Sequence, residues 1–366
     1  MHRALDLARQ ALWLTSPNPR VGCVITAADG MVLGEGHTQR AGGPHAEIMA
    51  LSDAAARGHD VRGATAWVTL EPCAHHGRTG PCCDALASAG IGRVVAALRD
   101  PNPLVAGEGL ARLQAAGVAA NGLPEDDPLA LQARELNIGF FSRMERGRPW
   151  VRMKIAASID GQTALANGQS QWITGPEARA DGHAWRARAC AVLTGIGTVL
   201  QDDPRLNVRG FEVPRQPHLV VVDSRLELPL GARLLQPTDA DAQDRKIWVY
   251  TASTGDAEKR GTLAARGVEV IDCAGPDGKV DLAAMLRDLA RREVNELHVE
   301  AGYKLNGSFM REALVDEWLV YIAPQWLGPG QGMAHLPALS HLDEALKLRF
   351  HTVSQIGEDL RLLLRR

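Results

Sequence analysis

The stretch LEPCAHHGRTGPCC, residues 70–83, places three cysteines and two histidines within fourteen residues. A disulfide, a zinc site and a reactive thiol all fit such a cluster, and each indicates a different class of protein. The chain has six cysteines; half lie in this stretch, and the scattered ones are Cys23, Cys190 and Cys273. This distribution is unlike a small disulfide-stapled domain, and in a reducing compartment it favours metal binding or catalysis.

Length and composition predict a two-domain protein. The chain has 366 residues, and a single core rarely grows beyond about 250 residues. The hydrophobic share is 45%, and no apolar run approaches the roughly 18 residues of a membrane span. The first residues have an apolar stripe at helical spacing, interrupted by Asp6, Arg9 and Gln10, which predicts a helix over 2–14 rather than a signal peptide. We therefore expect a cytoplasmic location.

The net charge of -3, without any run of Lys or Arg, argues against a polynucleotide substrate. Helical and strand-like segments alternate through residues 1–120, with a hairpin signal at Asp29-Gly30, and this rhythm indicates an α/β layer sandwich. The charged, Gly- and Pro-containing stretch RMERGRPW predicts a linker at about 142–148. Beyond it we expect a second α/β domain, with helices at 176–188 and 282–292 and strands at 190–194, 218–223, 246–250, 296–300 and 317–323.

Four residues of the first domain form a candidate catalytic metal site. His45 in PHAEI, Cys73 in EPC and Cys82 in GPCC supply three ligands, which leaves the fourth tetrahedral position for water. Pro44 and Pro81 place His45 and Cys82 at helix starts, where the geometry is loose enough for Glu47 to reach the same water. Zinc brings the pKa of its water near neutrality, and a carboxylate then carries the proton to a leaving amine.

Two blander interpretations remain open at this point. The cysteines and the histidine are core residues in the first. In the second, the metal is structural and Cys83 or His75 is the fourth ligand. Cys83 and Cys23 are better explained by packing than by chemistry in either case.

The His-x-Glu and Pro-Cys motifs resemble those of the zinc-dependent nucleobase deaminases. Eight residues separate Cys73 from Cys82, instead of the two of the usual Cys-x-x-Cys. The stretches PNPRVGCVI, GGPHAE, TLEPCAHHGRTGPCCDAL and DPNPLVAGEG together resemble the bifunctional riboflavin-biosynthesis deaminase/reductase family. HHGRT is the most discriminating piece, because cytidine and transfer-RNA adenosine deaminases lack it. One departure is Gly80, where proline is expected.

For the first domain, residues 1–144, the resemblance implies hydrolytic removal of the 2-amino group of 2,5-diamino-6-(ribosylamino)-4(3H)-pyrimidinone 5'-phosphate. Zinc would be held by His45, Cys73 and Cys82, with Glu47 as the catalytic acid and base. The inserted AHHGRTG would face an anionic substrate group. The implied substrate contacts of this domain are Asn18 and His76.

The second domain, residues 148–366, yields little from its residues alone. No G-x-G-x-x-G follows a strand with an acid about twenty residues on, so a Rossmann dinucleotide site is not supported. LTGIGTVL (193–200) and VEAGYKLNGSFM (299–310) either present backbone N–H groups to a phosphate or form ordinary tight turns. MKIAASIDG, SQWITG, TGIGTVLQDDPRLNVR and VEAGYKLNGSF, however, resemble the reductase half of the same family.

That resemblance implies a dihydrofolate-reductase-like domain that uses NADPH to reduce the ribosyl group to ribityl, giving 5-amino-6-(5-phosphoribitylamino)uracil. The implied substrate contacts are Ser170, Arg186, Leu206, Arg209 and Glu300. The implied cofactor contacts are Ala156, Trp172, Thr198, Asp202, Ser224 and the loop formed by Gly302, Tyr303, Lys304, Leu305, Asn306, Gly307 and Ser308.

Physical reasoning supports part of this assignment. Arg186 and Arg209 suit a sugar phosphate, since guanidinium forks match phosphate oxygens, although surface salt bridges are the alternative. Lys154 lies among small or apolar residues, where it either points into the cleft to orient the ribose or snorkels at a strand edge. Residues alone do not distinguish NADPH from NADH.

We therefore predict an α/β protein of two domains: an α/β/α sandwich of the cytidine deaminase type, then a dihydrofolate-reductase-like domain. It would be a bifunctional enzyme, with a zinc-dependent hydrolase acting on a cyclic amidine and an NADPH-dependent oxidoreductase, assembled as a homodimer through the reductase domain. Two alternatives remain. One is a deaminase of a free base or nucleoside whose second domain only binds a nucleotide, and the other is a non-enzymatic ligand-binding module with a structural metal.

Overall fold

The computed structural model describes residues 1–75, 80–102, 106–236 and 245–366 and divides the chain into two compact units, Met1–Arg148 and Pro149–Arg366. The segment expected to be a linker, 142–148, is mostly helical instead. Helix α6 (Ile138–Arg146) continues through it and ends at Gly147, whose φ of 64° suits glycine. The hydroxyl of Ser142 donates to the carbonyl of Arg148 at 2.8 Å. The charged, glycine-containing stretch at 142–148 is therefore the end of a helix and not an extended linker.

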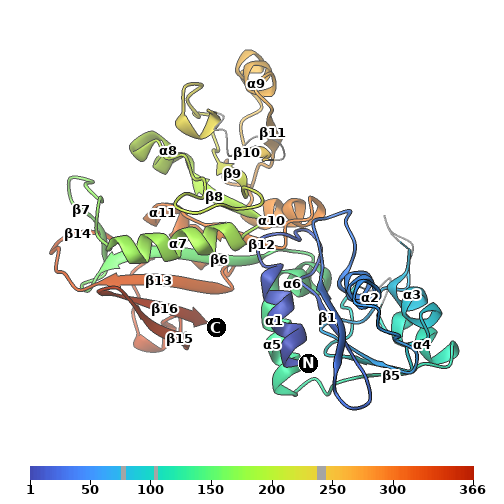
Figure 1. The fold of residues 1–366 in the computed structure, drawn as a ribbon. Coiled ribbons are helices and arrows are strands. Elements are labelled where there is room, and N and C mark those ends of the chain that lie inside the picture. The colour runs from blue at the N-terminus through green and yellow to red at the C-terminus, as the bar shows by residue number, and fades with distance from the viewer. Residues whose placement is uncertain (76–79, 103–105, 237–244) are drawn as a thin grey trace. The chain divides into compact units, whose positions relative to one another are not determined.

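Within the described residues, the N-terminal unit is a five-stranded sheet with helices on both faces (Figure 1). The strand order is β2-β1-β3-β4-β5; β1 is antiparallel to both neighbours, and β3, β4 and β5 are parallel. The strands are β1 (Gly22–Thr26), β2 (Val32–His37), β3 (Thr65–Val68), β4 (Arg93–Ala96) and β5 (Ala119–Gly122). The helices are α1 (His2–Gln10), α2 (Ala46–Ala56), α3 (Cys82–Ser88), α4 (Glu108–Ala115), α5 (Pro128–Leu136) and α6.

Small residues let α2 lie directly on the sheet. A Cβ on Gly34 would stand 2.2 Å from the carbonyl oxygen of Ala50, and one on Gly36 would stand 2.4 Å from the Cβ of Met49. On the opposite face, a Cβ on Gly22 would stand 1.9 Å from the carbonyl oxygen of Ala4 in α1. The expected α/β/α sandwich is confirmed. The close packing of α2 on the sheet also fixes the position of its N-terminus, where the candidate ligand His45 is the N-cap.

The C-terminal unit holds, in its described residues, a nine-stranded sheet of order β11-β10-β9-β8-β12-β6-β13-β16-β15 and a small β14-β7 pair. The nine strands pair in parallel except at β13–β16 and β15–β16, which are antiparallel. The strands are β6 (Trp150–Ser158), β7 (Gln162–Leu165), β8 (Ala191–Gly195), β9 (His218–Val222), β10 (Ile247–Thr251), β11 (Val268–Asp272), β12 (Glu296–Val299), β13 (Glu317–Ala323), β14 (Gly330–Gly332), β15 (Arg349–Ile356) and β16 (Asp359–Arg365). The helices are α7 (Pro176–Arg188), α8 (Ile196–Asp202), α9 (Ala257–Ala264), α10 (Leu282–Arg291) and α11 (Tyr303–Arg311).

Two large apolar clusters cover this sheet, besides a small one that contains Ala178 and Leu319. One joins β6 to α10 and α11, for example through Met153, Leu286 and Phe309. The other lies under α8 and α9, where Val199 and Leu263 are buried. The two-domain α/β architecture expected from the sequence is therefore confirmed.

A layer of buried charges lies where α7 covers the same sheet. Arg152, with 1% of its side chain exposed, pairs with Glu296 at 3.0 Å and with Glu317. Arg188 and Arg365 pair with the same two carboxylates at 2.7 and 2.6 Å. Each buried charge has a partner, as burial requires, and removing one would leave the others uncompensated.

Several elements differ from the sequence expectation. The helix predicted over 2–14 ends at Gln10, because bonds from Leu12 to Arg9 and from Leu14 to Ala11 tighten the chain into separate turns. The glycine-containing stretch LTGIGTVL forms a strand followed by helix α8. Among the described residues, no helix combines the length and the apolar character that a membrane crossing needs.

Candidate active sites

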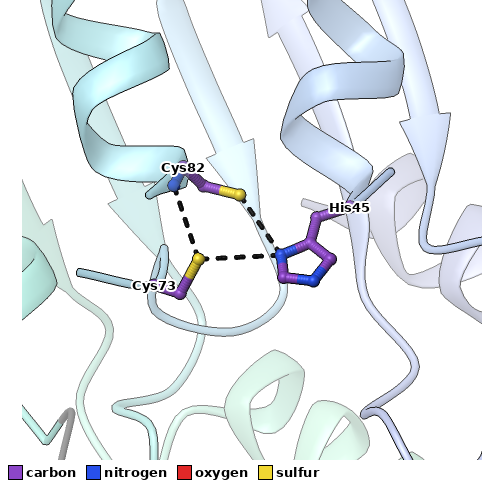
Figure 2. A group of neighbouring side chains, drawn as sticks. All are labelled: His45, Cys73 and Cys82. Atoms are coloured by element: carbon purple, nitrogen blue, oxygen red, sulfur yellow. Dashed lines mark hydrogen bonds between the residues drawn. The ribbon is translucent and has the colours of Figure 1, made fainter. Parts of the chain in front are cut away.

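Three side chains from separate segments meet in the N-terminal unit (Figure 2). His45 is the N-cap of α2, Cys82 is the first residue of α3, and Cys73 lies in the loop after β3. The Nδ1 atom of His45 lies 3.3 Å from the Sγ of Cys82 and 3.6 Å from the Sγ of Cys73. All three ligand atoms lie within 4.8 Å of one another. The three ligands expected from the sequence are thus brought together.

This geometry fits zinc. With Zn–S of about 2.3 Å and Zn–N of about 2.05 Å, a tetrahedral site places sulfur and nitrogen about 3.6 Å apart. Among the described residues, the group that could hold a metal has three members, and neither Cys83 nor His75 is one of them. Cys83 and Cys23 are buried in the hydrophobic core, as expected. Three protein ligands leave a position for water, which is typical of a catalytic rather than a structural zinc site.

Ionisation of the neighbouring groups suits proton transfer. The hydrogen bond between the two thiols, together with His45, lowers the pKa of the Cys73 thiol, and the same hydrogen bond raises the pKa of the Cys82 thiol. Glu47, in the first turn of α2, has 3% of its surface exposed. Burial, reinforced by the nearby Cys73, raises the pKa of Glu47 to about 7. A carboxyl group with that pKa can both accept and return a proton near neutrality.

The expected substrate contacts of this unit are less well defined. Asn18 lies in the turn after α1, where its backbone N–H donates to the carbonyl of Thr15 at 2.8 Å. His76 lies outside the described residues. The substrate roles of both stay predictions.

A cleft of about 790 Å³ opens in the C-terminal unit. It lies beyond the carboxyl ends of β8 and β12, next to the first residues of α8 and α11, and α7 lines one side. Such a crevice is where open α/β sheets commonly bind ligands. Among the residues expected to bind substrate or cofactor, the cleft is lined by Lys154, Ala156, Ser170, Trp172, Arg186, Thr198, Asp202, Leu206, Arg209, Glu300, Gly302, Tyr303 and Asn306.

The segment expected as a cofactor loop, 302–308, is instead the start of helix α11. The helical period turns Gly302, Tyr303 and Asn306 toward the cleft. Leu305 packs on the core, and a Cβ on Gly307 would stand 2.1 Å from the carbonyl oxygen of His335. Three further residues expected to bind cofactor are also outside the cleft lining: Ser224, Lys304 and Ser308.

Arg186 forms a bidentate ion pair with Glu300, so its guanidinium is already occupied and does not stand ready for a phosphate. Its Nε and Nη2 donate to the two carboxylate oxygens of Glu300 at 2.7 and 2.9 Å, and its Nη1 donates to the carbonyl of Asn207 at 2.5 Å. Burial opposes ionisation of Glu300, but the charge and hydrogen bonds of Arg186 outweigh it and hold the pKa of Glu300 well below its usual range. The two groups therefore act as one unit at the floor of the cleft.

Lys154 lines the cleft beside this pair, and its role in orienting the ribose stays a prediction. Burial lowers the pKa of its ammonium group, and Glu300 opposes that effect. Its Nζ lies 5.9 Å from the ring centre of Tyr321, within reach of a cation–π contact.

Sequence reasoning missed several basic residues of the cleft. Arg179 and His183 precede Arg186 at helical spacing on α7, and all three line the cleft. Basic residues at helical spacing predict a basic face on one helix, so these residues could have been found from the sequence. Arg205 and Arg233 also line it, although they lie far apart in sequence. Burial, together with Arg186 and Arg209, lowers the pKa of His183 to about 4.

Comparison with known proteins identifies the family. Residues 149–362 match the RibD C-terminal domain family, and residues 1–98 match the cytidine and deoxycytidylate deaminase zinc-binding region. The riboflavin biosynthesis protein RibD of Escherichia coli K12 is 43% identical, over 98% of this chain and 96% of its own. The chain belongs to the RibD family. It is accordingly a bifunctional riboflavin-biosynthesis enzyme with a deaminase half and a reductase half, as the resemblance implied.

Solved structures agree with this family assignment. Acinetobacter baumannii RibD in form 2 is 38% identical, with a TM-score of 0.87, over 100% of this chain and 97% of its own. A Thermotoga maritima diaminohydroxyphosphoribosylaminopyrimidine deaminase/5-amino-6-(5-phosphoribosylamino)uracil reductase is 32% identical, with a TM-score of 0.85, over 100% of this chain and 97% of its own. A non-enzymatic binding module is therefore not supported. The second domain of a RibD chain is a reductase domain rather than only a nucleotide-binding one.

The buried His298 generates a pH prediction. It lies on β12 two residues before Glu300, its side chain is fully buried, and burial lowers its pKa to about 3. The unfolded chain binds this proton near pH 6.5, so below that pH the unfolded state holds more protons than the native state. We predict that the free energy of unfolding falls by roughly 2 kcal/mol between about pH 6.5 and about pH 5 because of this residue.

Urea unfolding at these two pH values, followed by tryptophan fluorescence, measures the effect. His298→Asn should flatten the pH dependence, and the control His341→Asn, at an exposed histidine, should retain the slope of the parent protein. Equal slopes in all three proteins would contradict the assignment of the effect to His298.

Proposed function

We propose that the N-terminal unit removes the 2-amino group of 2,5-diamino-6-(ribosylamino)-4(3H)-pyrimidinone 5'-phosphate by hydrolysis. We propose that the C-terminal unit then reduces the ribosyl group of the product with NADPH. The observation that carries the first step is the convergence of His45, Cys73 and Cys82 beside the buried Glu47. The Thermotoga maritima relative, a deaminase and reductase of these two pathway substrates by name, supports the choice of substrates.

Zinc, when bound, supplies a Lewis acid that makes water acidic enough to act as a nucleophile near neutral pH. Glu47 would accept a proton from the attacking water as its oxygen adds to the ring carbon. The same carboxyl returns a proton to the departing nitrogen, so one C–O bond forms, one C–N bond breaks and ammonia leaves. The raised pKa of Glu47, about 7, suits both transfers.

In the reductase cleft, NADPH supplies a hydride to C1' of the ribosyl group when it is bound. The first turns of α8 and α11 present backbone N–H groups toward the cleft, an arrangement suited to the phosphates of a dinucleotide. Lys154 lies next to the ionised Glu300, where it is placed to orient the ribose or its opened form. Arg205, Arg209 and Arg233 line the same cleft and are suited to the substrate phosphate.

We also propose a homodimer through the reductase domain. Strand β15 is an edge of the nine-stranded sheet, and its Phe350 and Val353 are 66% and 57% exposed. Exposed apolar side chains on an edge strand favour pairing with another chain. Light scattering should give twice the mass of the chain, and Phe350→Lys should shift the protein toward monomer. A parent protein of single-chain mass throughout the micromolar range would contradict the proposal.

Replacing the catalytic carboxylate tests the deaminase step. Glu47→Gln should slow ammonia release about 10²- to 10⁴-fold, because the amide cannot carry the proton. Bound zinc, measured by metal analysis, should stay at the parent level. NADPH oxidation with the deaminated intermediate should also stay unchanged, since Glu47 belongs to the other unit.

The matched control is Glu125→Gln, at an exposed loop glutamate of the same unit. It should leave both reactions unchanged. Ammonia release that survives Glu47→Gln would rule out this role for Glu47. Equal turnover of the dephosphorylated substrate would instead favour a deaminase of a nucleoside or free base.

A further inference from the structure

The spacing of the two cysteine ligands poses a physical problem. Eight residues lie between Cys73 and Cys82, so the connecting chain does not itself fix the distance between the thiols as a two-residue spacer would. A longer connection also has more conformational freedom to lose when the site closes. Some other element must hold the two ligand-bearing segments together.

Helix α4 holds the segment that carries the first cysteine ligand, Cys73. Its N-cap is Gly107, which has no side chain to cap the helix. The buried carboxylate of Glu71, two residues before Cys73, does so instead: it accepts from the backbone N–H of Gly107 at 3.0 Å and of Leu110 at 3.1 Å. It also accepts from the backbone N–H of Asp100 at 3.2 Å. One carboxylate therefore fastens both Asp100 and the start of α4 to the EPC segment.

Close packing reinforces this attachment. A Cβ on Gly109 would stand 1.9 Å from the carbonyl oxygen of Pro72, the residue directly before Cys73. Glycine at this position lets the first turn of α4 touch the backbone that carries the ligand.

One turn further along α4, Arg112 reaches both ends of the insertion. Its Nη1 donates to the carbonyl of Ala74, which follows Cys73, at 3.1 Å. Its Nη2 pairs with Asp84, two residues after Cys82 in α3, at 2.6 Å. A backbone bond from the N–H of Cys83 to the carbonyl of Cys73, 3.2 Å long, joins the same two segments. A single guanidinium thus bridges the inserted loop at its base.

We propose that Glu71 and Arg112 are positioning residues which, through α4, fix the separation of the two cysteine ligands and so set the zinc affinity of the deaminase unit. Their side chains act on the ligand-bearing backbone. The inference rests on the proposed zinc-dependent deaminase and adds what holds its metal site in shape.

Zinc affinity of the full-length protein, measured by competition with a chromophoric chelator, tests the proposal without relying on activity. Arg112→Ala should raise the dissociation constant for zinc about three- to tenfold, because it removes an ion pair and a hydrogen bond. Glu71→Gln should weaken zinc binding by about tenfold, since an amide oxygen cannot replace both carboxylate oxygens as acceptors. Arg112→Lys, which retains the charge without the fork, should fall between Arg112→Ala and the parent.

The matched control is Arg134→Ala, which removes another ion pair of the same unit, with Glu145. That pair is 2.7 Å long with side chains 45% and 40% exposed, against 2.6 Å, 48% and 40% for Arg112 and Asp84. The control should bind zinc as the parent does. The ligand-field spectrum of the cobalt-substituted protein should change in Arg112→Ala and not in Arg134→Ala.

The outcomes separate this inference from the proposed function. A parent protein that binds no zinc would overturn the zinc-dependent deaminase itself. A parent that binds zinc, together with Arg112→Ala and Glu71→Gln variants of unchanged affinity, would overturn the positioning role alone. Should Glu71→Gln fail to fold, Arg112→Ala and Arg112→Lys still decide the question, because the side chain of Arg112 is half exposed.

Discussion

The N-terminal unit depends on one geometric requirement: an imidazole and two thiols from three segments must lie within 4.8 Å of one another. The sheet meets it by placing the first turns of two helices beside the loop after β3 (Figure 2). Glycines in β2 let α2 approach closely, which seats His45 and the buried Glu47 together. The positions of the ligands therefore follow from backbone packing well outside the site.

The C-terminal unit positions its functional groups by a different means. Under α7 it has a layer of paired buried charges around Arg152, and the Arg186–Glu300 pair continues that layer to the floor of the cleft. Buried ion pairs add little net stability, but an unpaired member is costly, so they strongly favour one arrangement. The charge state of Glu300 is thereby set by its neighbours before any ligand arrives.

Much of the metal site could be predicted, because the residue types and their spacing in the sequence indicate which side chains can bind a metal. His45 and Cys82 each follow a proline at a helix start, and Cys73 belongs to the short EPC motif. The Arg186–Glu300 pair could not be predicted in this way, since 114 residues separate its members and only the packing of α7 against β12 brings them together. The resemblance implied a loop over 302–308, whereas helix α11 begins at Tyr303, and its packing against the sheet outweighs the low helix propensity of Gly307.

If the two active sites of this chain work independently, removing the metal will stop only one of the two reactions, and a paired assay before and after chelation measures this. Ammonia release from the pyrimidinone ribotide and NADPH oxidation with the deaminated intermediate would be followed separately on the purified protein. Removal of the metal should abolish ammonia release and leave NADPH oxidation intact, and added zinc should restore the first reaction. Ammonia release that persists after complete loss of metal would contradict the role assigned to His45, Cys73 and Cys82.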